Sequence, residues 1–377
     1  MKKTTLRISR FILTAAAMAC AGTVSAQVVL GAGATLPQSL YNDIFSSNGI
    51  DGVVGAWDYE GGGSGEGKRR FLDKFSSNTV SFAGSDSVLK MVEFADYNQK
   101  NLGTWGPLIQ LPALITPIVL GYTKLNLPEL SLARAQVCDI FAGRVQTWGQ
   151  ILGNGDPQLI RVAYRSDRSG STEILSKFLS DTCSGDGFLI SDSFAAMVGG
   201  AMANGIPNHW QGVASEEDMS AAASANGSFG YLGPAYGFPP DDPAKVAKVD
   251  GFLPSTLNLL GISTPPVGTA AQDPMNWIPS FSSSTPGTGY PIYGTTNLLV
   301  AQCYDGGFGV GSKGLAIRSF LARLYSGARP YAQKISSHHF VELPNLWKVA
   351  IQQTFLPPSS NGLAIGNSAV CSSVGHP

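Results

Sequence analysis

The segment RSDRSGST, which starts at Arg165, carries residue types that could bind an oxyanion. Ser169, Gly170 and Ser171 are small, so a ligand can approach the backbone N–H groups beside them closely. Arg165 offers a planar guanidinium that fits the oxygens of a tetrahedral anion. Asp167 is close enough in sequence to hold that guanidinium in place. The alternative is an ordinary surface turn with a serine cap and two unrelated arginines.

Helical periodicity places these small residues at the start of a helix. A strand-like run over residues 160–164 leads into the segment, and apolar residues then recur at the spacing of one helix face: Ile174, Leu175, Phe178 and Leu179. N–H groups without intrahelical acceptors and the positive end of the helix dipole therefore point toward the small residues. This geometry favours an anion.

Three other polar turns could converge on the same place. The motif GATLP, which includes Thr35 and Leu36, is a glycine-containing turn from a strand into a helix. A glycine-rich loop over residues 60–68 includes Ser64. Asp86 ends a strand-like run, where α/β sheets usually place ligands. Each turn alone is ordinary loop chemistry.

Two other chemistries fit the sequence less well. The glycine-rich loop matches the first half of the P-loop motif, but Arg69 stands where serine or threonine would bind magnesium. The chain has no Gly-x-Ser-x-Gly motif and no Cys-x-x-Cys pair, and its four histidines lie far in sequence from the serine-rich turns. The residues therefore indicate no catalytic constellation, no metal site and no cofactor.

Residues 1–26 are typical of a secretory signal peptide. Four basic residues surround the start of a short apolar run, and small residues end at Ala26, as at a cleavage site. The run is too short to span a membrane. Cys20 lacks the usual leucine three residues before a lipidated cysteine, so we expect no lipid anchor. The expected location is periplasmic or secreted, with cleavage after Ala26.

Charge and cysteine content agree with export and argue against nucleic-acid binding. Cleavage removes four of 25 basic residues and no acidic one, which leaves 21 basic against 26 acidic residues and a net charge of −5. Such a chain suits neither nucleic acid nor an anionic membrane surface. The remaining cysteines are even in number and predict two disulfides in one of three connectivities: Cys138, Cys183, Cys303 and Cys371.

Length and element order predict a two-domain α/β protein. About 350 mature residues exceed the usual size of one core, and strand-like runs alternate with helical ones, which favours substantially parallel sheets. Helices are expected over residues 37–45, 137–141, 173–179 and 314–326. Strands are expected over residues 28–30, 80–86, 109–122, 160–164 and 292–300, with a linker or long loop over 264–290.

Together, these segments resemble the phosphate-binding receptors of bacterial Pst transporters, and most closely their DING branch. The matching motifs follow in order: GATLPQSLY from Gly33, GSGxGK from Gly63, AGSDS from Ala83, IFAGRxxxW from Ile140, YRxxxSGSTE from Tyr164, GYPI from Gly289, TNL from Thr296 and AIGN from Ala364. The chain departs from the branch at residues 28–31, where VVLG replaces DING, and at Arg168, where relatives usually carry a small residue.

The resemblance implies a periplasmic binding protein-like α/β fold, with two lobes, mixed sheets and a ligand cleft between the lobes. Lobe one would comprise residues 27–111 and 293–377, and lobe two residues 112–292. The implied disulfides, each within one lobe, are Cys138–Cys183 and Cys303–Cys371.

The resemblance also implies that the cleft binds inorganic phosphate. The implied ligand residues are Thr35, Leu36, Ser64, Asp86, Arg165, Ser169, Gly170 and Ser171, with Asp167 orienting the arginine. Asp86 would give selectivity, because phosphate near neutrality keeps a proton that a carboxylate can accept, whereas sulfate does not. We expect a monomer that delivers phosphate to a Pst-type permease or scavenges it outside the cell.

Two other functions remain open at this point. Some members of the DING branch are reported as alkaline phosphatases, and the same cradle could hold a phosphomonoester. Enzyme activity is therefore left undecided, with binding as the main expectation. The scaffold could also serve as an extracellular adhesin or interaction protein.

Overall fold

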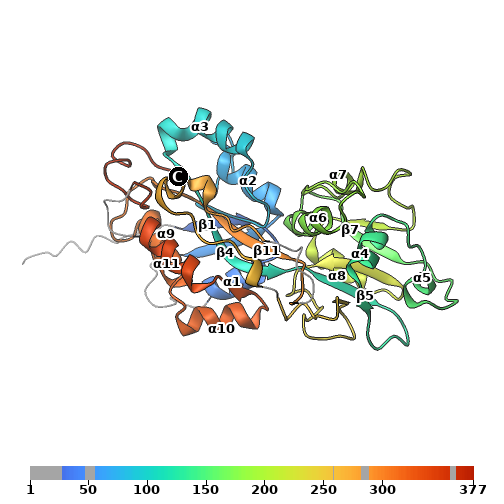
Figure 1. The fold of residues 1–377 in the computed structure, drawn as a ribbon. Helices are drawn as coiled ribbons and strands as arrows, with labels where there is room; N and C mark the ends of the chain where they lie inside the picture. Colours follow the sequence, from blue (N-terminus) through green and yellow to red (C-terminus); the bar gives the residue numbers. More distant parts are fainter. Residues whose placement is uncertain (1–27, 47–55, 258, 282–287, 357–361) are drawn as a thin grey trace, which may run out of the picture.

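The computed structural model describes residues 28–46, 56–257, 259–281, 288–356 and 362–377, which form two bodies, each built on one main sheet (Figure 1). The predicted signal peptide and its cleavage after Ala26 lie outside these residues. Within these ranges, no helix has the length and apolar character needed to cross a bilayer.

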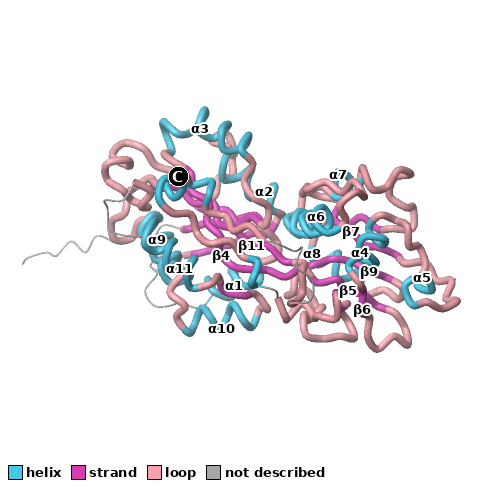
Figure 2. The backbone as a smooth tube through the Cα atoms, in the orientation of Figure 1, coloured by secondary structure: helices cyan, strands magenta, loops and turns pink. Residues whose placement is uncertain are grey.

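The first body, called here the six-stranded body, has a mixed sheet. Its strands lie in the order β12 (Val341–Glu342), β4 (Leu108–Pro117), β11 (Tyr293–Ala301), β3 (Phe82–Ser85), β1 (Val29–Gly33) and β2 (Trp57–Gly61). β1 is parallel to both of its neighbours, whereas β11 is antiparallel to both of its own. The helices around this sheet are α1 (Gln38–Ser46), α2 (Ser64–Leu72), α3 (Met91–Trp105), α9 (Lys313–Leu324), α10 (Arg329–Ser337) and α11 (Asn345–Phe355) (Figure 2).

The second body, called here the four-stranded body, is also mixed. Its strands lie in the order β5 (Val119–Thr123), β9 (Ser228–Leu232), β7 (Arg161–Arg165) and β8 (Gln211–Val213). Two short strands, β6 (Ser131–Leu132) and β10 (Lys248–Val249), pair separately. Its helices are α4 (Arg134–Phe141), α5 (Trp148–Leu152), α6 (Gly170–Thr182), α7 (Phe194–Val198) and α8 (Glu216–Ala223). Both sheets mix directions, as the family resemblance implies, rather than being substantially parallel.

The chain passes between the two sheets at adjacent places. Only Ile118 separates the end of β4 from the start of β5. The N–H of Ile118 donates to the carbonyl of Ile292, directly before β11, at 2.9 Å. The hydroxyl of Tyr290 donates to the carbonyl of Ile118 at 2.8 Å. The two connections are therefore bonded to each other, and the proposed lobe limits at residues 111/112 and 292/293 stay a prediction.

Most expected elements are present within a few residues of their expected limits, but the single strand expected over residues 109–122 is two strands. The apolar run continues through Ile118 because both strands are buried, so composition does not reveal that the chain changes sheets there. The expected linker over residues 264–290 is also partly folded. It contains the short 3₁₀ helices η2 (Gly268–Gln272) and η3 (Pro274–Asn276), and η1 (Leu259–Gly261) precedes it. The ring of Trp277 packs edge-on against that of Phe355, with the ring centroids 4.7 Å apart.

The glycine-rich loop expected over residues 60–68 is wrong in its second half, because α2 begins at Ser64. Gly67 lies inside this helix and against β1, where a Cβ atom on Gly67 would stand 2.5 Å from the Cα of Gly33. Glycine at this position therefore allows α2 to pack closely on the sheet. The second glycine of the half P-loop motif therefore serves helix–sheet contact here.

Candidate anion-binding site

Arg165 is the last residue of β7, where it is buried between two carboxylates. Its Nε and Nη2 atoms donate to Asp167 at 2.7 and 2.6 Å, and Nη1 donates to Glu216 at 2.7 Å. Burial lowers the pKa of Arg165, but the charge of Glu216 and the hydrogen bond to Asp167 outweigh burial and raise that pKa. The guanidinium is therefore charged and held in one plane. Nη1 also faces Thr35 Oγ1 of the six-stranded body at 3.5 Å.

The small residues lie at the start of α6, as the periodicity predicts. Ser169 precedes the helix, and Gly170 and Ser171 begin it. Among the described residues, the N–H groups of Gly170 and Ser171 have no hydrogen-bond acceptor. Ser171 donates its hydroxyl to Glu216 at 2.8 Å, so the Ser169 hydroxyl, 2.6 Å away, donates to Ser171. The backbone N–H groups are thus the donors that α6 presents to an anion.

Two turns of the six-stranded body present further helix starts. Thr35 and Leu36 lie between β1 and α1, and Ser64 is the first residue of α2. Gly63 precedes Ser64 with a φ of 86°, a conformation that favours glycine. In the described part of the chain, the N–H groups of Thr35, Leu36 and Ser64 have no acceptor. Three helix starts therefore offer unpaired N–H groups near Arg165.

Gly170 brings the two bodies into contact. A Cβ atom on Gly170 would lie 2.2 Å from the Cβ of Asp86 and 2.7 Å from Ser64 Oγ, so the space between these residues fits glycine alone. Leu36 packs in the same way against Gly233 of the four-stranded body. The structure thus brings all eight predicted ligand residues to one buried seam: Thr35, Leu36, Ser64, Asp86, Arg165, Ser169, Gly170 and Ser171.

Asp86 is a carboxyl with only 2% of its surface exposed. Its Oδ1 accepts a hydrogen bond from Thr296 Oγ1 at 2.6 Å. Its backbone N–H donates to Ser64 Oγ at 3.0 Å, so the hydrogen of the Ser64 hydroxyl is left to donate elsewhere. Burial raises the pKa of Asp86 to about 7, and the hydrogen bond from Thr296 opposes that rise. The carboxyl therefore changes charge near neutral pH.

Glu216 is a site residue that sequence reasoning missed. It is fully buried, and besides Arg165 and Ser171 it accepts from the N–H of Gly233 at 3.0 Å. Burial raises the pKa of Glu216, while the charge of Arg165 lowers it. In the sequence, Glu216 is the first of three acidic residues after Ser215, which caps α8. That pattern is typical of a first helical turn, so nothing singles out Glu216. Thr296 is also missed as a site residue, although it belongs to a resemblance motif.

Other contacts close the seam around the site. The Tyr236 hydroxyl donates to the carbonyl of Thr35. The N–H of Val88 donates to Glu173 at 3.1 Å. Lys90 lies 3.6 Å from Asp192, and this ion pair also joins the two bodies. The structure therefore represents a closed arrangement of the two bodies.

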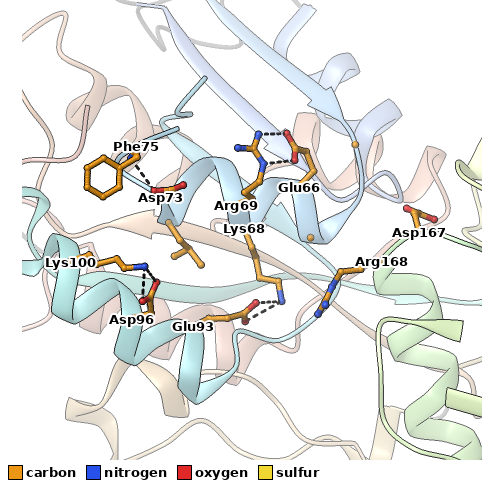
Figure 3. A pocket seen from close by; sticks show the side chains of 13 residues that line it. Glu66, Lys68, Arg69, Asp73, Phe75, Glu93, Asp96, Lys100, Asp167 and Arg168 are labelled. Carbon is orange, nitrogen blue, oxygen red and sulfur yellow. Dashed lines mark hydrogen bonds and ion pairs between the residues drawn. The ribbon is translucent and has the colours of Figure 1, made fainter. Parts of the chain in front are cut away.

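A cavity of about 620 Å³ adjoins the site on its outer side (Figure 3). It lies between α2 and α3, and Asp167 and Arg168 of the four-stranded body line one end. Arg168, which departs from the branch pattern, pairs with the buried carboxylate of Asp192 at 2.8 Å. Because Asp167 lines this cavity and also holds Arg165, the cavity reaches the wall of the anion site.

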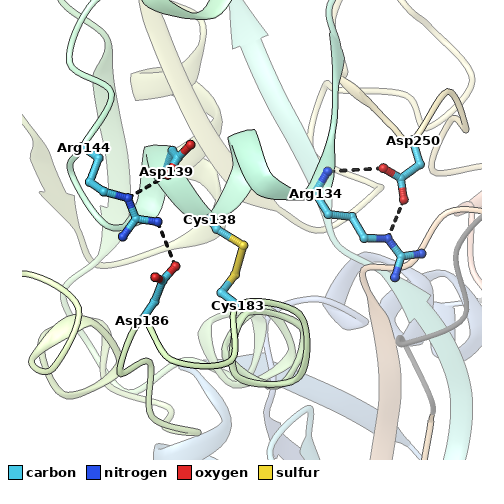
Figure 4. The surroundings of a disulfide bond; sticks show 7 residues. All are labelled: Arg134, Cys138, Asp139, Arg144, Cys183, Asp186 and Asp250. Carbon is cyan, nitrogen blue, oxygen red and sulfur yellow. Dashed lines mark hydrogen bonds and ion pairs between the residues drawn. A yellow bond between two sulfur atoms is a disulfide. The ribbon is translucent and has the colours of Figure 1, made fainter.

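The structure contains both implied disulfides, Cys138–Cys183 and Cys303–Cys371. Figure 4 shows the first, which joins α4 to the end of α6 beside the ion pair of Arg144 with Asp186. In the described ranges, one group of cysteine and acidic side chains is dense enough to consider for a metal, namely Cys138, Cys183 and Asp186. Its two sulfurs are bonded to each other and are not available as thiolate ligands.

Comparisons with known proteins agree on one family. The family profile described as "PBP superfamily domain" matches residues 21–317. The chain is 38% identical to a Pseudomonas aeruginosa protein named "Alkaline phosphatase L", over 97% of this chain and 99% of that protein. It is 33% identical to a "Phosphate-binding protein" of an unknown prokaryotic organism, over 92% and 99% of the two chains.

Solved structures give the same result. The fold is similar to that of a periplasmic phosphate-binding protein, PfluDING, whose structure is described as bound with phosphate. The TM-score is 0.81 and the identity 31%, over 93% of this chain and 99% of that one. A phosphate-binding protein from Stenotrophomonas maltophilia gives a TM-score of 0.80 at 30% identity, over the same shares of both chains.

Proposed function

Because this chain belongs to the PBP superfamily and its relatives include DING-type phosphate-binding proteins, we propose that it binds inorganic phosphate between its two lobes. The observation that carries the proposal is the convergence of three helix starts, Arg165 and Asp86 at one buried seam. The proposed ligand atoms are the N–H groups of Thr35, Leu36, Ser64, Gly170 and Ser171, the hydroxyls of Thr35 and Ser64, the guanidinium of Arg165 and one oxygen of Asp86. Ser169 lies beside these donors, with its N–H bonded to the carbonyl of Asp192 and its hydroxyl to Ser171.

The charges around this seam indicate that hydrogen bonds, rather than a net positive charge, would hold the anion. Arg165 is held by two carboxylates, Asp167 and Glu216, so these three groups together carry a charge of −1 when ionised. Dipoles at the helix starts must therefore hold the anion. Hydrogen bonds to a charged group contribute roughly 1.5–3 kcal/mol each, and micromolar affinity corresponds to about 8 kcal/mol. The proposed donors suffice even after the cost of ordering both bodies.

Asp86 would select phosphate over sulfate. An ionised carboxylate accepts a hydrogen bond from an anion that keeps a proton, and it repels an anion that has none. Phosphate keeps a proton near neutral pH, and sulfate does not. The burial of Asp86 supports this role, because repulsion between two unpaired oxygens is strong where water is absent.

Calorimetric titration of the purified protein with phosphate and with sulfate tests the proposal. We expect phosphate to bind at micromolar concentration or below, and sulfate at least about tenfold more weakly. Asp86→Asn should reduce this discrimination more than it reduces phosphate affinity. Equal affinity for both anions, or no uptake of either, would overturn the proposal.

Phosphomonoester hydrolysis is the second candidate function. Two observations favour it: close relatives are named alkaline phosphatases, and the cavity beside Asp167 offers space next to the anion site. A fluorogenic phosphomonoester assay, with Arg165→Ala as the control, separates the two functions. Turnover that disappears in Arg165→Ala would support the enzyme. Turnover that persists in the variant would indicate a contaminant.

We also propose that the protein acts as a monomer in the periplasm or outside the cell and serves a Pst-type permease. Relatives named PstS and the predicted signal peptide support this setting. Deletion of the gene should lower phosphate uptake at limiting phosphate if a permease depends on the protein. A partner captured equally well with and without phosphate would instead favour an adhesin or interaction role.

A further inference from the structure

Thr296 is the residue that holds Asp86 from within the six-stranded sheet. It is fully buried on β11, and its hydroxyl donates to Asp86 Oδ1 at 2.6 Å. Among the described residues, the other carboxyl oxygen, Oδ2, has no hydrogen-bond donor. Thr296 therefore occupies one oxygen of the carboxyl and leaves the second for a ligand.

The sheet fixes this contact. β11 pairs antiparallel with β3 so that Asn297 stands opposite Ser85, which places Thr296 opposite Asp86. The amide of Asn297 donates to the carbonyl of Ser85 at 3.0 Å. A register shift between β11 and β4 falls directly between Thr296 and Asn297. Such irregularities commonly re-aim a side chain beside a functional site. The contact therefore belongs to one rigid element of the fold.

Several charged or titratable groups face Asp86 from neighbouring elements. Glu216 of α8 and Glu173 of α6 raise its pKa, and Arg165 of β7 lowers it. The phenols of Tyr41, Tyr59 and Tyr236 also lie within its electrostatic reach. Of all lowering influences on the pKa of Asp86, the hydrogen bond from Thr296 is the largest, ahead of the charge of Arg165.

We propose, on the basis of the phosphate function proposed above, that Thr296 is a positioning residue that favours the ionised form of Asp86 and thereby disfavours sulfate. An ionised Asp86 accepts the proton of phosphate and repels sulfate. A protonated Asp86 instead donates a hydrogen bond from Oδ2 to a sulfate oxygen, and the complex then takes up one proton from solvent. Phosphate binds in both cases, because it offers both protonated and unprotonated oxygens. The preference for phosphate over sulfate therefore depends on pH, and Thr296 sets the pH below which this preference is lost.

The test compares the wild-type protein with Thr296→Val, which removes the hydroxyl and keeps the shape, and with Thr296→Ser, which restores the hydroxyl. Thr295→Val is the matched control, since Thr295 is a buried neighbour on the same strand that lines a different cavity. Phosphate and sulfate affinities are measured by calorimetry from about pH 5 to about pH 9, a range that brackets the carboxyl titration.

We expect Thr296→Val to bind sulfate about tenfold more tightly than the wild-type protein at about pH 9, where Asp86 of the wild-type protein is ionised. This gain corresponds to a rise of about one unit in the pKa of Asp86. Thr296→Ser and Thr295→Val should match the wild-type protein. If Thr296→Val binds phosphate but keeps the wild-type ratio of phosphate to sulfate affinity at every pH, the proposal is wrong. Should Thr296→Val fail to fold, Thr296→Ala, which also removes the hydroxyl, takes its place. A gain in sulfate affinity in Thr296→Ala supports the proposal, and an unchanged ratio of phosphate to sulfate affinity contradicts it.

A second readout separates this proposal from the phosphate function. Carboxyl ¹³C resonances of Asp86, followed through a pH titration without anion, report its pKa directly. A higher titration midpoint in Thr296→Val supports the coupling even in a protein that binds no phosphate. An unchanged midpoint contradicts the coupling even in a protein that binds phosphate well.

Discussion

Gly170 and Asp86 are in direct contact across the seam between the two bodies, so that a single added carbon on Gly170 would stand 2.2 Å from the Cβ of Asp86. The start of α6 and the end of β3 can approach this closely only without a side chain at residue 170. The closed arrangement therefore depends on one hydrogen atom in place of a methyl group.

Gly170→Ala should weaken phosphate binding while each body stays folded. Overpacking costs about 1–3 kcal/mol, which corresponds to a loss of roughly fivefold to 150-fold in affinity when it is relieved by separating the bodies. Calorimetry measures the affinity. Gly103→Ala is the matched control, because a Cβ atom there meets no atom within 4 Å. If the two variants bind phosphate equally well, Gly170 and Asp86 do not meet in the bound form.

Glu216→Ala should destabilise the protein strongly. The change leaves Arg165 buried with one carboxylate partner fewer and removes the acceptor of Ser171. Loss of one partner from a buried ion pair costs about 3–5 kcal/mol. The free energy of unfolding in urea measures the effect. Glu217→Ala, an exposed neighbour on the same helix, should change stability by less than about 0.5 kcal/mol. If both variants lowered the free energy of unfolding by a similar amount, the buried ion pair would not be a main source of stability.

His376 should make the protein sensitive to acid. Its ring stacks on that of Phe71, with the ring centroids 4.3 Å apart. Burial lowers the pKa of His376 from 6.5 to about 4. The folded state therefore stays neutral while the unfolded state takes up a proton, so stability is complete above about pH 6.5 and falls as the pH drops toward 4. This loss amounts to about 3 kcal/mol.

His376→Phe keeps the ring contact and removes the titration. Its free energy of unfolding in urea should fall less steeply than that of the wild-type protein between about pH 6.5 and pH 4. His339→Asn serves as the control, because His339 is exposed and has a positive φ that asparagine tolerates. Parallel pH profiles for the wild-type protein and His376→Phe would remove His376 as the cause.

The sequence alone places Ser169, Gly170 and Ser171 correctly at a helix start, because the apolar period of α6 continues directly from them. It also predicts the order of strands and helices that carry Thr35 and Asp86. These predictions are local, since each depends on residues within about four positions along the chain. The contact of Gly170 with Asp86 is different, because 84 positions separate the two residues and only the fold brings them together.

The partners missed from the sequence are those with an ordinary local explanation. Glu216 satisfies the rule for a first helical turn, and Thr296 satisfies the rule for a β-branched residue in a strand. Nothing in their neighbours marks them as partners of Arg165 and Asp86. The helical nature of the segment after Ser64 was hidden for a similar reason, because Gly67 is unfavourable in a helix until its packing on Gly33 is seen.

The hydrogen bond between Ile118 and Ile292 ties the two crossing segments together, so a rotation about these segments would open the molecule. Such a rotation divides the site without dismantling either half. Asp86 and Thr296 would stay together on the half that accepts a ligand's proton, while Arg165 and Glu216 would stay together on the half that carries the start of α6. An ion that reaches the open form would therefore contact one half at a time, and only an ion that bonds to both halves would hold the molecule closed.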